Sequence, residues 1–133
     1  MPRYLNPPNL PRPASRYSQG VAHGAAYKRV LVSGQIGVDA SGKLAEGIEA
    51  QMAQALDNVL AVIAAAGLGP ADVVKIVCYV TEPDRVKAWR RLREEKLGAC
   101  QPAATYLQVA GLADPAWLVE IEAEAIQEGA AGR

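Results

Sequence analysis

The chain has 133 residues, of which 50% are hydrophobic and 21% charged, the balance of a soluble globular domain. This length suffices for one hydrophobic core and is too short for two domains of ordinary size. Fourteen Lys and Arg residues balance fourteen Asp and Glu residues, so the formal net charge is zero. The chain therefore lacks the basic field that supplies most non-specific nucleic-acid affinity, which disfavours a nucleic-acid partner.

The few cysteine and histidine residues restrict redox and metal chemistry. Cys78 and Cys100 are too few for a disulfide framework, and Cys78 lies in an apolar run typical of a buried thiol. Because His23 is the only histidine, the sequence does not support a zinc site of the usual kinds. The N-terminus has no apolar signal region and no run approaches a membrane span, so we expect no membrane partner and a cytoplasmic protein.

The N-terminal third contains an arm and strand-like segments. Residues 1–15 hold five of the nine prolines and are predicted to form an extended arm, followed by a single domain over 16–127 and a flexible tail over 128–133. The run 29–38 has the composition of a strand. With the residues that precede it, it predicts a hairpin whose turn lies near 23–26, with His23 exposed to solvent in that turn.

Two regular elements follow in the middle of the chain. Apolar residues recur at three- and four-residue steps from about Gly47 to Ala66, which predicts an amphipathic helix ending at Gly67. The run from Val73 to Val80 is almost continuously apolar and predicts a central strand covered on both faces or nearly so.

A second helix is predicted after this strand. Thr81 is a suitable cap, Pro83 suits the first turn, Asp84 suits the positive helix end, and Gly98 is a stop signal. Its apolar side comprises Val86, Trp89, Leu92 and Leu97. Its other faces carry arginines that we expect to be solvated beside Glu94 and Glu95, namely Arg85, Arg90, Arg91 and Arg93.

The C-terminal stretch from Cys100 to Gln127 predicts two strands. Along the second, side chains alternate between an apolar face (Trp117, Val119, Ile121, Ala123 and Ala125) and a face with three carboxylates (Leu118, Glu120, Glu122 and Glu124). Such an acidic face meets water, a cation or a subunit boundary.

The predicted order is two strands, a helix, a strand, a helix and two strands. One sheet with two helices packed on one face satisfies this order, which is an α+β fold. With no third helix to cover the other face, we expect an oligomer. The sequence has no P-loop, Rossmann glycine set, serine-centred elbow or metal-spaced His/Cys set.

Six short segments occur in order along the chain: Tyr17 to Val21 (YSQGV), Ser33 to Gln35 (SGQ), Gln51 to Gly67, Asp72 to Lys75, Pro102-Ala103 and Val119 to Ala123 (VEIEA). Together they resemble the RidA/YjgF family, the reactive-intermediate (enamine/imine) deaminases. The resemblance spans roughly Arg16 to Ile126.

This resemblance implies a chorismate-mutase-like α+β fold with a mixed sheet, assembled as a homotrimer with clefts between subunits that take a small-molecule ligand. Members of the family hydrolyse 2-imino or enamine acids to 2-keto acids and ammonia without a cofactor. In that scheme an arginine binds the substrate carboxylate through two hydrogen bonds. A glutamate on the last strand positions or activates the attacking water.

Carried onto this chain, the resemblance makes Glu120 the catalytic carboxylate; the alternative is an exposed strand residue. It places the substrate-binding cleft at Tyr17, Ser33, Gly34, Gln35, Ala104, Thr105 and Arg90. Ala104 stands where the family has its carboxylate-binding arginine, and Tyr106 stands where a cysteine is common.

A charge-assisted hydrogen bond contributes about 1.5–3 kcal/mol, and the family arginine makes two, so its loss would slow turnover of a small imino acid by two or more orders of magnitude. Efficient deamination then requires another cation. Arg90, in place of a typical asparagine, is the best placed of three candidates, ahead of Arg16 and Arg91. The alternative for Arg90 is a plain surface charge.

Three functions remain open at this point. The first is an enamine/imine deaminase with altered substrate choice, since alanine in place of arginine enlarges the cleft and makes it less positive. The second is a trimer that binds a small molecule or partner without turnover. The third, a ribonuclease or translation inhibitor, is disfavoured by the neutral charge, the single histidine and the lack of a basic, aromatic stripe.

Overall fold

The computed structural model describes residues 2–129, except for the side chain of Tyr27. In chain order its elements are β1 (Arg3–Leu5), β2 (Gly20–Ala22), β3 (Ala26–Gln35), α1 (Ile48–Ala65), a 3₁₀ turn η1 (Pro70–Asp72), β4 (Val73–Val80), α2 (Val86–Leu97), β5 (Ala103–Gln108) and β6 (Val119–Glu128). Within the predicted arm, the chain forms strand β1. The predicted tail over 128–133 lies outside the described residues from residue 130 onward.

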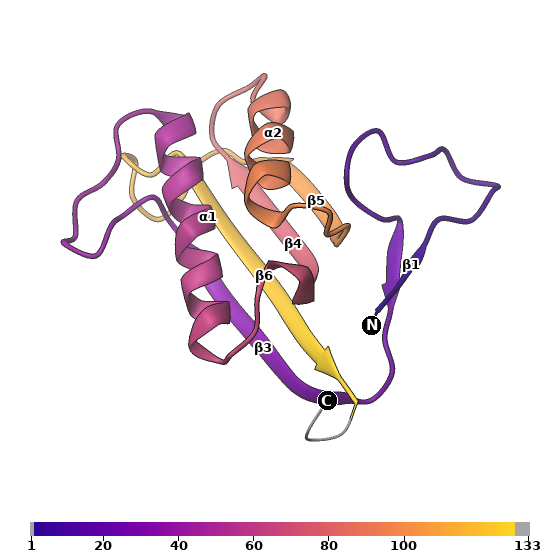
Figure 1. Cartoon of the computed structure of the whole chain (residues 1–133). Helices are drawn as coiled ribbons and strands as arrows, with labels where there is room; N and C mark the ends of the chain where they lie inside the picture. The colour runs from indigo at the N-terminus through magenta and orange to yellow at the C-terminus, as the bar shows by residue number, and fades with distance from the viewer. Residues whose placement is uncertain (1, 130–133) are drawn as a thin grey trace.

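A four-stranded mixed sheet in the order β3-β6-β4-β5 forms the centre of the molecule. β4 and β5 are parallel, whereas β6 is antiparallel to both of its neighbours. Helices α1 and α2 lie side by side on one face of this sheet (Figure 1). The prediction of an α+β fold with two helices on one face of a mixed sheet is therefore confirmed.

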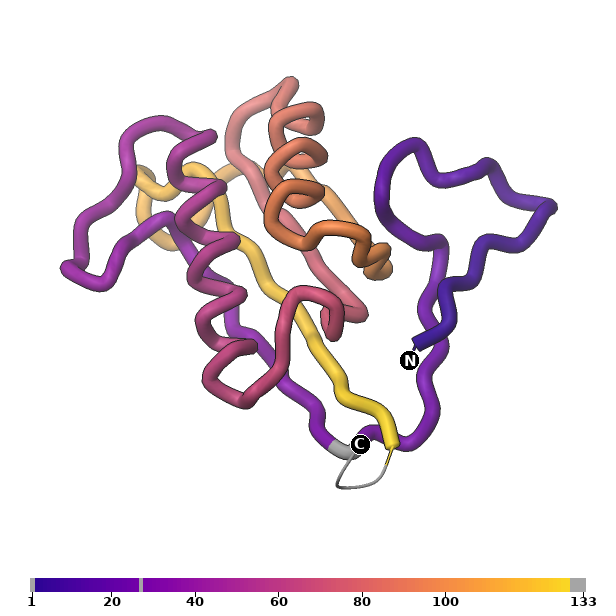
Figure 2. The backbone as a smooth tube through the Cα atoms, viewed as in Figure 1, coloured from indigo at the N-terminus to yellow at the C-terminus, as the bar shows by residue number. Residues whose placement is uncertain are grey.

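The predicted N-terminal hairpin is wrong. β2 pairs with β1 in a separate two-stranded ribbon and makes no ladder with β3. The segment before β2 is bound to the opposite edge of the sheet, because the Ser18 N–H donates to the Pro102 carbonyl (3.0 Å) and the Ser18 hydroxyl to the Gln101 carbonyl (2.7 Å). The ribbon and its wide loop consequently stand beside β5 (Figure 2).

The middle elements agree with the sequence pattern. α1 begins at Ile48, and its buried stripe includes Met52, Leu56, Val59 and Ile63. Gly67 follows it with φ +81°, a conformation that glycine adopts without steric cost. β4 is a central strand, flanked by β6 and β5, but the helices cover only one of its faces. Lys75, Val77 and Tyr79 on the other face are only partly buried, so the predicted cover on both faces is wrong within one chain.

The start of α2 was predicted too early. The helix begins at Val86, because Asp84 has φ +60° and interrupts any helix that starts at Thr81. The Thr81 N–H instead donates to the Leu118 carbonyl (3.0 Å), which ties the loop to the entrance of β6. The helix ends before Gly98 (φ +62°), as predicted.

The alternation along β6 is confirmed on its apolar face. Val119, Ile121, Ala123 and Ala125 are buried against the helices, and the carboxylate side chains point to the opposite face. Within residues 2–129, no helix has the length and apolar character needed to cross a bilayer.

Candidate functional site

A cavity of about 320 Å³ lies where the segment over 15–19, helix α2 and strand β5 meet. It brings together four residues that the sequence resemblance places in a cleft, namely Tyr17, Arg90, Ala104 and Thr105. A larger hollow of about 670 Å³ lies within the N-terminal loop, and of the residues that the resemblance places in a cleft only Tyr17 lines it. The smaller cavity is therefore the better candidate for chemistry.

Strand pairing explains why β5 supplies this cavity. Ala104 lies opposite Ile76 and Tyr106 opposite Cys78, two core residues, so both β5 side chains point to the helix side of the sheet. Burial raises the pKa of the Tyr106 phenol, which keeps it a neutral hydrogen-bonding group. With alanine at position 104, this wall of the cavity carries no charge of its own.

The same cavity contains a cation that the sequence prediction missed. Arg93, expected on a solvated helix face, is only 3% exposed. Its guanidinium carbon lies 5.6 Å from the Trp89 ring centroid and 5.9 Å from that of Tyr17, and one terminal nitrogen donates to Ser15 Oγ (2.8 Å). Burial lowers the pKa of Arg93, against the opposing effect of Glu94. The helical spacing from Trp89 to Arg93 is the signal that could have identified it.

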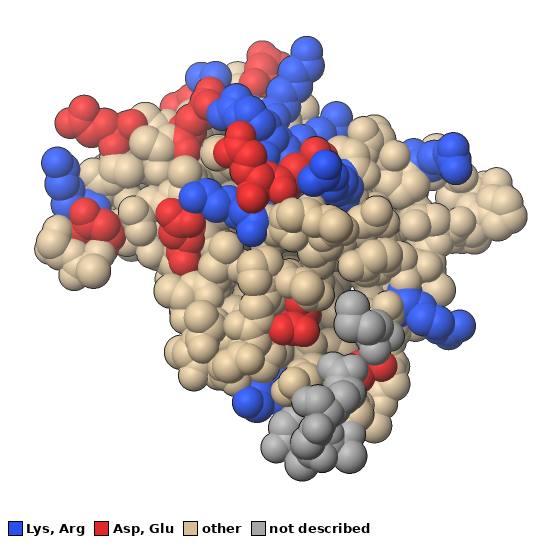
Figure 3. All heavy atoms as spheres, in the orientation of Figure 1, with Lys and Arg blue, Asp and Glu red and all other residues tan. Residues whose placement is uncertain are grey.

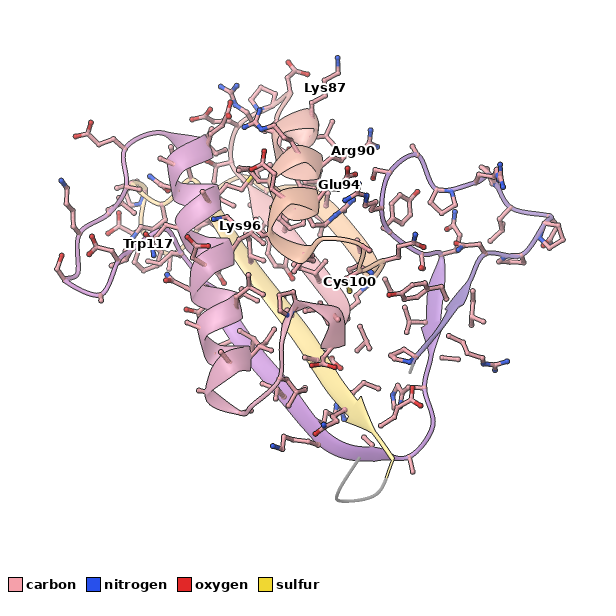
Figure 4. The ribbon with its side chains drawn as sticks, viewed as in Figure 1. Lys87, Arg90, Glu94, Lys96, Cys100 and Trp117 are labelled. Atoms are coloured by element: carbon pink, nitrogen blue, oxygen red, sulfur yellow. The ribbon has the colours of Figure 1, made fainter. Side chains whose placement is uncertain are left out.

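The other arginines named from the sequence occupy different surroundings. Arg90 is partly exposed and lines the cavity; together with Glu94 it lies on the side of α2 that faces the N-terminal segment (Figure 4). Arg16 donates to the Gly98 carbonyl (3.1 Å) at the end of α2. Arg91 pairs with Glu49 on α1 (2.7 Å). Arg16 and Arg91 do not line the cavity.

Glu120 and the Ser33-Gly34-Gln35 segment form a second group, away from the cavity. Glu120 lies opposite Tyr79 in the ladder and therefore points to the face of the sheet without helices. A register irregularity between Val32 and Gln35 in β3 brings Gly34 against it. A Cβ atom at position 34 would lie 2.0 Å from Glu120 Oε2, so only glycine leaves the carboxylate in this position.

Of the three carboxylates on this face, two have partners on neighbouring strands. Glu122 accepts a hydrogen bond from the Tyr79 hydroxyl, which raises the pKa of that phenol, and Glu124 pairs with Arg29 (3.1 Å). Glu120 makes no hydrogen bond or ion pair with any residue in the described part of the chain. It is thus the carboxylate that can interact with a water molecule or a ligand.

The face of the molecule that carries α2 displays acidic and basic side chains intermixed (Figure 3), with no extended area of one sign. Groups of three or more His, Cys, Asp or Glu side chains that could hold a metal ion are absent from the described residues. The charged groups of the two candidate sites are therefore the guanidinium groups of Arg90 and Arg93 in the cavity and the Glu120 carboxylate on the open face.

Comparison with known proteins identifies the family. A family model described as Endoribonuclease L-PSP matches residues 8–127. The chain is 31% identical to a crystal structure from Yersinia pestis, a protein of unknown function of the conserved Rid protein family, with a TM-score of 0.84 over 95% of this chain and 98% of that one. It is also 31% identical to the YjgF gene product of Escherichia coli, with a TM-score of 0.69 over 95% of this chain and 99% of that one. This chain belongs to the Rid/YjgF (Endoribonuclease L-PSP) family and has its chorismate-mutase-like fold.

Similar proteins carry more specific names. Over 122 residues the chain is 38% identical to the 2-iminobutanoate/2-iminopropanoate deaminase of Salmonella typhimurium, covering 89% of this chain and 91% of the relative. It is 32% identical over 122 residues to a RutC family protein of Pyrococcus horikoshii, covering 90% of this chain and 94% of that protein.

Proposed function

We propose that this protein hydrolyses a reactive 2-imino or enamine acid to the corresponding 2-keto acid and ammonia. The observation that carries the proposal is a buried guanidinium in one cavity together with a Glu120 carboxylate that is unpartnered among residues 2–129. Near full-length similarity to a relative named as a 2-imino acid deaminase supports it. A cation suits the substrate carboxylate, and a carboxylate suits the attacking water.

The reaction needs only these two kinds of group. Water adds to the imine carbon, forming a C–O bond, while Glu120 accepts one proton from the water. The imine reacts in its protonated form, so the nitrogen of the resulting carbinolamine is a neutral amine. Glu120 passes its proton to that amine, the C–N bond breaks, and the hydroxyl proton transfers to the departing ammonia as the C=O bond forms. No redox change occurs, and the positive charge near the substrate carboxylate holds the imine carbon in place.

The two groups act together only across a boundary between copies. Ala104 and Glu120 point to opposite faces of the same sheet, so one small ligand cannot contact both within a single chain. β5 is an edge strand, and the cavity opens beside it. We therefore propose a homotrimer in which the open sheet face of one copy, with Glu120, packs against the cavity of the next.

The deamination assay generates the unstable substrate in situ with a second enzyme. A pyridoxal-phosphate-dependent threonine dehydratase releases the unstable enamine and imine, and a coupled dehydrogenase follows 2-keto acid formation. We expect the wild-type protein to accelerate this step and Glu120→Gln to abolish the acceleration. Glu122→Gln is the matched control, since it changes the neighbouring carboxylate on the same face. Equal rates for wild type and Glu120→Gln would refute the catalytic assignment.

The boundary is tested by mixing two inactive variants. Glu120→Gln removes the carboxylate, and Ala104→Trp fills the cavity. After unfolding and refolding of a 1:1 mixture, about one quarter of the boundaries in a cyclic trimer combine an intact carboxylate with an intact cavity. We expect about one quarter of the wild-type rate; no recovery would contradict a site shared between copies.

Substrate choice is proposed to extend to imines larger than 2-iminobutanoate, because Ala104 leaves space between Tyr106 and the helix. An L-amino-acid oxidase that generates imines from leucine or phenylalanine provides the comparison. We expect Ala104→Leu to reduce activity on the larger imines more than on 2-iminobutanoate. If wild type is silent on every imine but binds 2-keto acids, the protein is instead a binding trimer without turnover.

A further inference from the structure

The guanidinium of Arg93 has hydrogen-bonding capacity that the described residues do not use. A guanidinium carries five N–H donors, and one terminal nitrogen of Arg93 donates to Ser15 Oγ (2.8 Å). The Nε atom is buried and has no hydrogen-bond partner within residues 2–129. A buried donor without a partner costs free energy, so this position is one where a further acceptor is favourable.

The charge of Arg93 is likewise unbalanced. Among residues 2–129, no carboxylate oxygen lies within ion-pair distance of its guanidinium, although buried charges in proteins are usually paired. Two aromatic rings, those of Tyr17 and Trp89, hold the group in place through cation–π contacts. These contacts fix the position of the guanidinium but leave its in-plane N–H donors for an anion.

The surroundings favour Arg93 over Arg90 as the group that binds an anion. Arg90 is partly exposed, so water screens its charge, whereas an interaction with the 3% exposed Arg93 is screened much less. A planar carboxylate matches the guanidinium fork with two parallel hydrogen bonds. The opposite wall, at Ala104, offers neither a competing charge nor a steric barrier.

We propose that Arg93, not Arg90, is the residue that binds the ligand carboxylate in this cavity. That the ligand is a 2-imino or 2-keto acid rests on the proposed function; that it carries a carboxylate follows from Arg93. The anchor therefore belongs to helix α2, and the ligand carboxylate lies between α2 and the segment that contains Tyr17.

The test measures binding, not turnover. Calorimetric titration of the full-length protein with 2-oxobutanoate gives the affinity, and butan-2-one is the uncharged comparison. Losing two charge-assisted hydrogen bonds lowers the affinity by a factor of about 100 or more. We expect that loss for Arg93→Gln, a smaller loss for Arg90→Gln, which also lines the cavity, and no change for the matched control Arg91→Gln, which does not. Unchanged affinity in a folded Arg93→Gln protein, or the large loss in Arg90→Gln, would overturn the proposal.

Because Arg93 also contacts Ser15 and two rings, its replacement can disturb packing. The double variant Arg93→Gln/Ala104→Arg therefore returns a cation from the facing strand, and we expect it to regain affinity for 2-oxobutanoate. A measurement on the unaltered protein adds a readout independent of any variant's stability. With ¹⁵N-labelled arginine, 2-oxobutanoate should shift the Arg93 Nε–H resonance more than that of Arg90; no shift at saturation would refute the anchor.

The binding and turnover experiments fail independently. If 2-oxobutanoate binds through Arg93 and no imine is hydrolysed, the proposed function is wrong and the anchor stands. If imines are hydrolysed and Arg93→Gln binds 2-oxobutanoate as wild type does, the function stands and the anchor is wrong. No binding of 2-oxobutanoate to the wild-type protein at about 10 mM would reject the anchor outright.

Discussion

Gly34 sets the position of the Glu120 carboxylate, and replacing it with alanine tests that carboxylate without changing its chemistry. The new Cβ atom would lie 2.0 Å from Glu120 Oε2, 2.7 Å from Cδ and 3.0 Å from Cγ. Ordinary van der Waals contact begins near 3.4 Å, so the carboxylate has to withdraw by about 1.4 Å. Displacing a reacting group by about 1 Å can cost on the order of 100-fold in rate.

We therefore expect Gly34→Ala to lower kcat/KM in the coupled imine assay by about 100-fold while changing the free energy of unfolding by less than about 1 kcal/mol. The stability change is small because the displaced atoms end a flexible side chain. Gly111→Ala, which meets nothing within 4 Å, is the matched control.

The double variant Gly34→Ala/Glu120→Ala distinguishes a direct effect from an indirect one. If Gly34→Ala acts only by moving the carboxylate, it adds no further loss to that of Glu120→Ala. Wild-type kcat/KM in Gly34→Ala, or an additive loss in the double variant, would refute this reasoning.

Two further perturbations address stability. Gln51→Leu removes a buried side chain whose Oε1 accepts from the half-buried Leu118 N–H (2.9 Å), and it should cost about 1–3 kcal/mol in urea unfolding, whereas Gln54→Leu, at a more exposed position, should cost less. Hydrogen bonds led by the Ser41 hydroxyl lower the native-state pKa of Asp39, so the stabilisation from its charge is complete above the unfolded pKa of about 3.9 and is lost as pH falls through the native value. The difference in melting temperature between wild type and Asp39→Ala should therefore be constant above about pH 5 and shrink below it; a difference that persisted unchanged at pH 2 would contradict this.

The regular elements were predictable because their periodicity is strong. The apolar stripe of α1, the apolar run of β4 and the alternation along β6 each determine a local structure and a buried face. The start of α2 was not predictable in this way. Thr81 and Asp84 have the chemistry of helix-start residues, but the Thr81 N–H is used by Leu118, a tertiary hydrogen bond outside the local pattern.

The predicted pairing of β2 with β3 is wrong for a similar reason. Sequence proximity favours a hairpin with β3, but two hydrogen bonds from Ser18 bind the chain to the start of β5. The candidate site residues stay predictions, and one chain brings together only some of them. Tyr17 and Ala104 share a cavity as the resemblance implies, but Arg93 was assigned to solvent because charge was given more weight than helical spacing.

The alternation of side chains in the sheet links this fold to its proposed activity. Ala104 in β5 points to the helices because it lies opposite the core residue Ile76, whereas Glu120 in β6 points away because it lies opposite Tyr79. No change of loop or rotamer reverses these directions, since a one-residue shift in register would also expose the core. A reaction that needs both groups therefore requires a second copy of the chain, and loss of assembly should abolish turnover even where each copy stays folded.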